Sequence, residues 1–294
     1  MLCQHSRALC LVALVFAACG TPEAPQAEEL ANDAKGVLVG AGDIASCDSP
    51  GDEATAALLD GIEGTIFTTG DNVYSSGKLS EFRDCYEPSW GRHRHRTRPA
   101  PGNHDHKTDG AAGYFAYFGT AAGPERRGYY SYALADWHIV VLDSELHLEG
   151  DDAQHAWLRE DLASHRATCT LGYWHHPRFS SGTDHGSDPG MQSIWQILYD
   201  AGADVVLNGH EHNYERFAPQ TPQGEPDSHR GIRQFVVGTG GKGFYDFGSP
   251  IANSEFRYNS DFGVLKLVLN SSAYEWEFIN TAREVIDRGT GTCH

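Results

Sequence analysis

The sequence predicts an α/β fold built from two packed, mixed β-sheets with helices on the outside. Short runs rich in Val, Ile and aromatic residues alternate with helical patterns from about residue 36 onward. Two pairs of these runs follow one another closely enough to form antiparallel hairpins, so the sheets should mix strand directions. No internal repeat or linker is visible within residues 36–294, which we interpret as one domain.

Each expected element rests on its local pattern. Strands are expected where a short run is apolar and rich in β-branched or aromatic residues. These runs are 37–41, 65–69, 97–100, 171–174, 204–207 and 234–237, with hairpins formed by 129–134 with 137–142 and by 262–269 with 273–279. Helices are expected at 52–59, which is rich in Ala and Leu, at 154–165 and at 191–200, where apolar residues recur at helical spacing.

Composition excludes several classes of protein. Hydrophobic residues make up 40% and charged residues 21% of the 294 residues, as is typical of a globular domain. No stretch reaches the roughly 18 uninterrupted apolar residues that a transmembrane helix needs. Forty acidic residues against 22 basic residues give a formal net charge of −18, and such a field repels polyanions. We therefore expect no nucleic-acid binding.

The amino terminus has the pattern of an export signal. Residues 1–18 carry Arg7 and then an apolar run too short to span a membrane, which predicts a secretory signal peptide. The run ends before Cys19 and Gly20 in a pattern that resembles a lipoprotein box, with Cys19 as the lipidated residue. Phe16 stands where Leu is usual, so cleavage without lipidation is the alternative. Residues 19–35 are expected to be a disordered tether, and the protein to be exported, either membrane-anchored or secreted.

Export would place the cysteines in an oxidising compartment, where disulfides form. Removal of the signal and acylation of Cys19 would leave four cysteines, an even number that is consistent with two disulfides in an oxidising compartment. These are Cys47, Cys85, Cys169 and Cys293. Four cysteines allow three pairings, and our hypothesis is Cys47–Cys85 with Cys169–Cys293. No CxxC spacing is present, so a thiolate metal site is not expected.

Polar, metal-competent side chains follow five of the expected strands. The sequences are Gly-Asp at 42–43, Gly-Asp-Asn-Val-Tyr at 70–74, Pro-Gly-Asn-His-Asp at 101–105, His-His-Pro at 175–177 and Asn-Gly-His-Glu-His at 208–212. Each alone is typical of a turn or loop, but strand ends in α/β sheets form the crevice where ligands bind. Carboxylate, amide and imidazole groups together suit first-row metal ions. The sequence therefore predicts a metal centre at the strand ends.

The order of these motifs resembles the calcineurin-like metallophosphoesterase superfamily. Within it, Tyr74 three residues after Asp71, and the run His-Glu-His-Asn-Tyr-Glu-Arg at 210–216, are similar to the purple acid phosphatases. The resemblance covers roughly residues 37–245 and implies a four-layer sandwich of two sheets and flanking helices. Because the first core strand is expected to begin at residue 36, it implies the small single-domain form, without the amino-terminal β-sandwich of the plant enzymes.

The resemblance also implies a site for two metal ions. Asp43, Tyr74 and His212 would hold one ion, Asn103, His175 and His210 the other, and Asp71 would bridge them. A tyrosinate ligand favours Fe(III) at the first position and leaves Fe(II), Zn(II) or Mn(II) for the second. If Tyr74 points away, a colourless Mn/Zn site is expected instead. Two such ions clamp phosphoryl oxygens and present a metal hydroxide for in-line attack.

Further residues are expected to support the reaction. His104, oriented by Asp105, and His185 are the candidate proton donors to the leaving group. His176 is expected to pack beside the ligands, with Tyr214 and Glu215 supporting the imidazoles. Arginines at 92, 94, 96 and 98 precede the Asn103 motif, and internal ion pairing is favoured there over phosphate steering. The glycine-rich run at 238–243 lacks the spacing of a nucleotide-binding loop and predicts a tight turn beside the site.

Together these observations predict an exported phosphatase that hydrolyses small phosphate monoesters with an acidic to neutral optimum. The alternative with the same metal site is a phosphodiesterase or nucleotide hydrolase. A non-catalytic surface binding protein is the alternative from a different class. The sequence predicts no oligomeric state.

Overall fold

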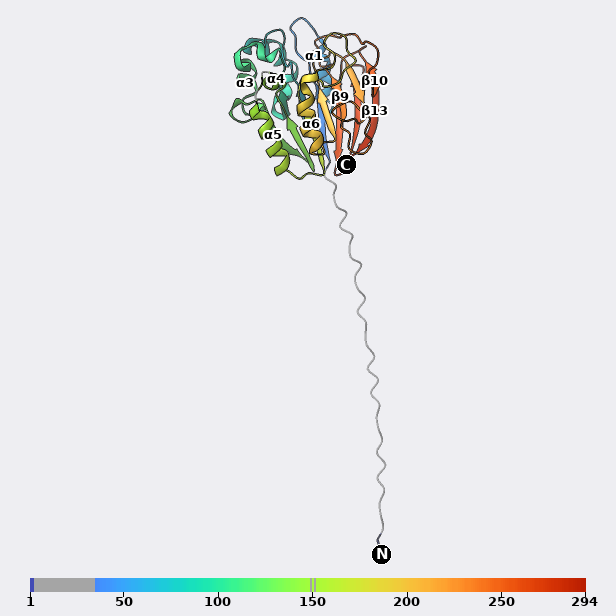
Figure 1. Ribbon diagram of the computed structural model, residues 1–294. Helices are drawn as coiled ribbons and strands as arrows, with labels where there is room; N and C mark the ends of the chain where they lie inside the picture. The colour runs from blue at the N-terminus through green and yellow to red at the C-terminus, as the bar shows by residue number, and fades with distance from the viewer. Residues whose placement is uncertain (3–34, 149, 151) are drawn as a thin grey trace. The chain divides into compact units, whose positions relative to one another are not determined.

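The computed structural model describes residues 1–2, 35–148, 150 and 152–294. The signal-peptide interpretation, most of the proposed tether and Cys19 lie outside these residues. No helix in the described segments is long and apolar enough to cross a membrane. From residue 35 onward the chain forms two mixed β-sheets and several short helices, shown in Figure 1.

The first sheet has six strands in the order β13-β12-β11-β1-β2-β3. Their bounds are β1 Gly36–Ala41, β2 Thr65–Thr69, β3 Thr97–Ala100, β11 Gly263–Asn270, β12 Ala273–Asn280 and β13 Val285–Thr292. Strands β1, β2 and β3 run parallel, whereas β11 is antiparallel to β1 and continues into an antiparallel meander with β12 and β13. The carboxyl ends of three parallel strands therefore meet at one edge.

The second sheet has seven strands in the order β10-β8-β9-β7-β6-β5-β4. Their bounds are β4 Tyr130–Leu134, β5 Trp137–Val141, β6 Cys169–Tyr173, β7 Val205–Asn208, β8 Tyr214–Phe217, β9 Arg233–Val237 and β10 Ser254–Tyr258. Strands β5, β6, β7 and β9 are parallel. At one side β4 pairs antiparallel with β5, and at the other β8 pairs antiparallel with β9 and β10 with β8. This sheet also offers the ends of several parallel strands at one edge.

Among the described residues, six α-helical segments accompany the sheets. They are α1 Gly51–Leu59, α2 Leu79–Glu81, α3 Ala112–Phe118, α4 Ser144–Leu148, α5 Asp152–Ser164 and α6 Gln192–Asp200. In Figure 1, α5 and α6 lie side by side, and their apolar residues pack on the outer face of the seven-stranded sheet. Leu158 of α5 and Trp195 of α6 are fully buried there. Burying these faces supplies the apolar stabilisation that short helices lack alone.

The main core lies between the sheets and is rich in aromatic side chains. Phe67 and Tyr173 meet across it with ring centroids 5.8 Å apart, and Phe235 packs against Trp276 at 5.6 Å. The outward-facing residues of the β11–β13 meander alternate with these buried ones, as the two-residue period of strands requires. The core thus fixes the two strand-end edges relative to each other.

The predicted strands and helices are all confirmed, with boundary shifts of at most two residues. The sequence interpretation missed α2, α3 and α4, the edge strands β10 and β13, and β8, which lies between β10 and β9. Strand β13 has little apolar content and is recognised through its ladder with β12, from Ala273 opposite Thr292 to Phe278 opposite Asp287. The predicted disulfide pairing is confirmed, with Cys47 bonded to Cys85 and Cys169 bonded to Cys293.

Candidate metal centre

The predicted ligands converge from both sheets. Asp43 follows β1, Asp71 and Tyr74 follow β2, and Asn103 follows β3, whereas His175 follows β6 and His210 and His212 follow β7. Ligand atoms of Asp43, Asp71 and His175 all lie within 4.8 Å of one another. Residues up to 169 positions apart in sequence, here 43 and 212, therefore form one polar cluster at the strand ends.

Tyr74 lies on one side of the cluster, and its hydroxyl points inward. It donates to Asp43 Oδ1 at 2.8 Å or to Asp71 Oδ2 at 3.0 Å, and it lies 3.2 Å from His212 Nε2. The His212 ring is stacked on Tyr245, with centroids 3.9 Å apart and planes 8° from parallel. This arrangement excludes the geometry in which Tyr74 points away from the site.

His175 organises the other side. Its Nε2 lies 3.0 Å from Asn103 Oδ1, 3.1 Å from His210 Nδ1 and 3.5 Å from Asp71 Oδ2. Its Nδ1 donates to the carbonyl of Thr69 at 2.8 Å. That bond fixes the ring so that Nε2 faces Asn103, His210 and Asp71, as is usual for metal-binding histidines.

Three of the predicted ligands have a left-handed backbone. The φ angles are 59° at Asp43, 47° at Asp71 and 72° at His210. Such a conformation costs a non-glycine residue on the order of 1–2 kcal/mol, and it is maintained here by the surrounding hydrogen bonds. The amide of His210 donates to Asp43 Oδ2 at 2.9 Å, and the amide of His104 donates to Asp71 Oδ1 at 2.7 Å.

Two glycines allow the backbone to approach these carboxylates. A Cβ atom on Gly102 would lie 2.4 Å from Asp71 Oδ1, and one on Gly209 would lie 2.7 Å from Asp43 Oδ2. Neither distance is compatible with a side chain unless the carboxylate moves. The glycines preceding Asn103 and His210 therefore have a steric role in forming the site.

Within the described chain, the centre buries negative charge that is balanced by imidazoles and not by a lysine or arginine. Asp43 and Asp71 are 0% and 2% exposed, and within the described chain neither forms an ion pair with Lys or Arg. Burial opposes protonation of His175, but the charges of Asp71 and Asp43 outweigh it and raise the pKa of His175 to about 10. Burial and the same carboxylates raise the pKa of Tyr74 well above its usual value.

These properties fit bound cations. A buried cluster of carboxylates is costly unless positive charge neutralises it, and carboxylate, phenol, amide and imidazole donors suit first-row metals. One ion could be bound by the first ligand group, which is Asp43, Tyr74 and His212. A second ion could be bound by the second ligand group, which is Asn103, His175 and His210. Asp71 lies between the groups, as a bridging ligand must.

His104 adjoins the centre, but Asp105 does not orient it as predicted. His104 Nδ1 donates to the carbonyl of Ser75 at 2.8 Å, and its Nε2 lies 3.9 Å from Asp71 Oδ2. The fully buried Asp105 carboxylate instead accepts from the amides of Asn72 and Gly102 and from the Asn72 side chain. Asp105 therefore stabilises the loop that carries Asn103, and the expected His104–Asp105 interaction is corrected.

His185 covers His210 from the solvent side. The two rings stack with centroids 3.9 Å apart, and His185 is exposed. Both residues line a cavity of about 420 Å³ together with His176. The main-chain amide of His185 donates to Glu211 Oε1 at 2.6 Å, so Glu211 positions this loop. Sequence interpretation overlooked Glu211, although it lies between the two ligand histidines of the 208–212 motif.

The three expected supporting residues divide into two groups. His176 packs beside His210 at 4.2 Å between ring centroids, and its Nδ1 lies 3.1 Å from Glu145 Oε1. The Tyr214 hydroxyl donates to Asp287, and Glu215 accepts from the Ser181 amide and the Ser254 hydroxyl. Tyr214 and Glu215 therefore stabilise the sheet and the 181–186 loop, which corrects the expectation that they support the imidazoles directly.

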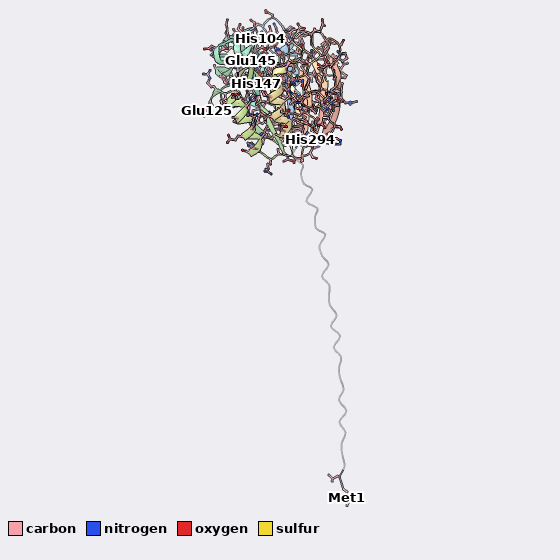
Figure 2. The ribbon with its side chains drawn as sticks, viewed as in Figure 1. Met1, His104, Glu125, Glu145, His147 and His294 are labelled. Carbon is pink, nitrogen blue, oxygen red and sulfur yellow. A yellow bond between two sulfur atoms is a disulfide. The ribbon has the colours of Figure 1, made fainter. Side chains whose placement is uncertain are left out.

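Three more residues near the centre were not predicted. Lys242 Nζ lies 5.2 Å from the Tyr74 ring centroid, and its amide donates to the Asp43 carbonyl, so the 238–243 run is a loop beside the site. Tyr245 stacks on His212 as described above. Glu145 comes from α4, and Figure 2 shows it with His104 toward one end of the domain, away from His294. No motif in the sequence distinguishes Glu145 or Tyr245.

This fold, with metal-binding side chains at the strand ends of two sheets, defines the metallophosphoesterase class. The chain belongs to the calcineurin-like phosphoesterase family, whose family model matches residues 38–214. A second family model, iron/zinc purple acid phosphatase-like protein C, matches residues 231–288. The family resemblance expected from the motifs is confirmed.

Curated relatives include purple acid phosphatases. Purple acid phosphatase 15 of Arabidopsis thaliana is 29% identical over 170 residues, covering 51% of this chain and 32% of the relative. An uncharacterized protein of Mycobacterium tuberculosis is 26% identical over 216 residues, covering 58% of this chain and 41% of the relative. The matched segments thus span between a third and two fifths of these relatives.

Solved structures show the same fold. A purple acid phosphatase isolated from yellow lupin seeds aligns with a TM-score of 0.73 at 20% identity, covering 88% of this chain and 54% of that chain. GAP50, the anchor in the inner membrane complex of Plasmodium, aligns with a TM-score of 0.72 at 16% identity, covering 89% of this chain and 90% of that chain. The predicted fold class is confirmed.

Proposed function

We propose that this protein is an exported, metal-dependent hydrolase of small phosphate monoesters. The observation that carries the proposal is the convergence of all seven predicted ligands around the buried carboxylates of Asp43 and Asp71, whose partners are imidazoles and a phenol and, among the described residues, no lysine or arginine. Family membership supports phosphoester chemistry. The relatives named purple acid phosphatases support the monoester assignment.

Two metal ions are the cofactors that we propose. Asp43, Tyr74 and His212 would hold Fe(III), because a hard phenolate oxygen suits that ion. Asn103, His175 and His210 would hold Fe(II), Zn(II) or Mn(II). When bound, such ions stabilise charge on phosphoryl oxygens and lower the pKa of water.

Two histidines beside the centre are candidates to donate a proton to the leaving group. A departing alkoxide needs a proton, and His185 is exposed at the mouth of the site above His210. His104 is the second candidate, since the Ser75 carbonyl binds its Nδ1–H and leaves Nε2 directed toward Asp71. The 420 Å³ cavity beside His210 is large enough for a small leaving group.

Export is supported by the two disulfides. Cys47–Cys85 and Cys169–Cys293 close segments of 38 and 124 residues, and such bonds persist in oxidising compartments. We propose that the chain is lipidated at Cys19 or secreted. Incorporation of a radiolabelled fatty acid into the wild-type chain but not into Cys19→Ser tests the anchor, and equal labelling of both would contradict it.

The activity is tested by comparing 4-nitrophenyl phosphate with bis(4-nitrophenyl) phosphate as substrates for protein purified from an oxidising compartment. We expect monoester turnover to exceed diester turnover and to be highest below neutral pH. Preference for the diester would indicate a phosphodiesterase with the same metal centre. Absence of turnover on both, with metals bound, would contradict catalysis and favour a binding protein.

A further inference from the structure

The arginine run at 92–98 divides into two structural groups. Arg92 forms ion pairs with Glu53 at 3.0 Å and Asp60 at 2.9 Å. Arg96 donates to the carbonyls of Leu59, Ile62 and Gly64, at the end of α1 and in the turn that follows it. These two arginines are thus accounted for by internal contacts.

The alternate basic residues line a cavity instead. Arg94, His95 and Arg98 contribute to the wall of a cavity of about 790 Å³, together with Phe118, Tyr130 and Tyr132. The cavity lies where the edge strands of the two sheets, β3 and β4, approach each other. The Tyr130 hydroxyl donates to the carbonyl of Pro99 at 2.9 Å and joins these edges.

Aromatic rings position both guanidinium groups. Arg94 Cζ lies 4.7 Å from the Tyr117 ring centroid, and Arg98 Cζ lies 5.8 Å from that of Tyr132. The Tyr117 hydroxyl in turn donates to Glu87. A cation–π contact orients a guanidinium without occupying its N–H donors. Arg98 Nη1 also donates to the carbonyl of Thr97, at 3.5 Å.

Neither guanidinium is neutralised by an acidic partner. Among the described residues, Arg94 and Arg98 form no ion pair, although the chain has 40 acidic and 22 basic residues. The chain is acidic overall, so a cavity lined by two unpaired guanidiniums and an imidazole is a local region of positive charge. Arginine N–H groups in this state suit phosphate oxygens, which they bind in pairs.

The cavity is separate from the metal centre. None of the seven predicted ligands lines it, and neither do His104 or His185. Its volume is in the range of about 300–1,000 Å³ that is typical of small-molecule sites. The tyrosine and phenylalanine rings offer apolar surface beside the charged groups, which suits a ligand with an organic part.

We propose that this cavity binds a small phosphate-bearing anion at a site distinct from the metal centre. Arg94 and Arg98 would donate hydrogen bonds to its oxygens, and Tyr130, Tyr132 and Phe118 would contact an organic substituent. Free phosphate and an organic phosphate share the chemistry that the arginines recognise. The proposal does not depend on the catalytic function of the metal centre.

Arginine labelling tests the site directly. The metal-loaded full chain is treated with phenylglyoxal, which modifies guanidinium groups, and labelling rates are measured for each arginine by peptide mass spectrometry. Inorganic phosphate and phenylphosphonate, whose C–P bond is not an ester, are the two probes, with sodium chloride matching ionic strength. Arg159, an exposed arginine of α5, is the internal control.

We expect either probe to slow labelling of Arg94 and Arg98 at least about threefold and to leave Arg159 unchanged, as is expected if the probe occupies their N–H groups. Protection at a lower concentration of phenylphosphonate than of phosphate would identify an organic ligand, and equal protection would identify free phosphate. If neither probe slows the labelling of Arg94 and Arg98 more than that of Arg159, the proposal is overturned.

A matched pair of variants provides a second test. By calorimetry, Arg94→Gln/Arg98→Gln should bind one equivalent of phenylphosphonate fewer than wild type, whereas Arg159→Gln should bind as many. Monoester turnover at low substrate should be retained in both variants, because these residues lie outside the metal centre. Equal stoichiometry in the wild type and the double variant would contradict a second site.

Discussion

The buried carboxylates around Asp287 and around Asp43 and Asp71 differ in how their charge is balanced. Asp287 accepts from the Tyr214 hydroxyl at 2.7 Å, Arg216 Nε at 2.8 Å and Trp276 Nε1 at 3.1 Å. Its negative charge is therefore compensated by an arginine of the same chain. The carboxylates of Asp43 and Asp71 are buried among imidazoles and a phenol, with no such arginine.

The difference separates a structural cluster from a functional one. A buried carboxylate that pairs with an arginine and accepts from neutral donors has its charge balanced and its hydrogen bonds formed once the chain folds. In the Asp43–Asp71 cluster the positive charge that the chain itself can supply comes from imidazoles, chiefly His175 with its raised pKa, and a bound cation would take the place of that proton. Buried aspartates therefore stabilise the fold in one cluster and form the candidate metal centre in the other. Isosteric Asp→Asn substitutions distinguish these two roles.

The largest expected effect is the loss of activity in Asp71→Asn. Asp71 lies between both ligand groups, so its replacement should lower monoester kcat/KM by at least about 10³-fold, or about 4 kcal/mol. Steady-state assays of the two proteins at equal concentration measure this. Activity within tenfold of wild type would show that Asp71 is not central to the site.

Asp287→Asn should lower the stability of the protein and leave its activity nearly unchanged. Removing the charge leaves Glu255 as the ion-pair partner of Arg216 and weakens the hydrogen bonds to residue 287, so the free energy of unfolding should fall by about 1–3 kcal/mol. Urea denaturation measures that loss, and kcat for the monoester should stay within twofold of wild type. An unchanged urea midpoint would remove the structural role assigned to Asp287.

His185→Ala tests catalysis within the functional cluster. Loss of a general acid lowers kcat by about 10²-fold, whereas the ligands and hence the metal content remain. The effect should shrink for substrates with better leaving groups, which need less protonation. Equal effects on 4-nitrophenyl phosphate and phenyl phosphate would mean that His185 contributes through packing on His210 alone.

A third buried carboxylate, Asp143, is paired with a titrating group. His106 Nε2 lies 2.9 Å from Asp143 Oδ2. Burial lowers the pKa of His106, but the hydrogen bond to Asp143 and the charges of the nearby carboxylates together outweigh burial and raise the pKa to about 8. Glu145 and Asp105 also raise this pKa. Because the pKa is higher in the folded than in the unfolded state, the pair stabilises fully below about pH 6.5 and less as pH rises through 8.

The expected size of this pH effect is about 2 kcal/mol between pH 6 and pH 9. Urea denaturation of the metal-free protein at the two pH values measures it, with His106→Gln as the control that should lack this component. The same decrease in stability in wild type and variant would show that another group causes it.

The metal-centre residues were predictable because they follow strands in a fixed order. Four of the five motifs combine a glycine with a metal-binding side chain, and strand ends are easily located from short apolar runs. Contacts that depend on packing were not predictable. The sequence suggests that Asp105 orients its neighbour His104, yet folding buries its carboxylate against Asn72 and Gly102.

The missed elements share a physical cause. Strands β8 and β10 and the edge strand β13 have too little regular apolar alternation to be distinguished from loops, and they form because neighbouring strands offer free hydrogen-bonding groups. Glu145 reaches its place through the position of α4, which no local pattern encodes. Sequence alone therefore locates the ligands better than their surroundings.

The most direct test of the account is the metal content of the folded chain. Wild type, Asp71→Asn and Asp287→Asn are reconstituted with iron and zinc, freed of unbound metal, and analysed by elemental mass spectrometry. We predict two metal ions per chain in wild type and in Asp287→Asn, and fewer than one in Asp71→Asn. Equal metal content in all three proteins, or less than one ion in wild type, would contradict a centre whose buried charge is balanced by bound metals.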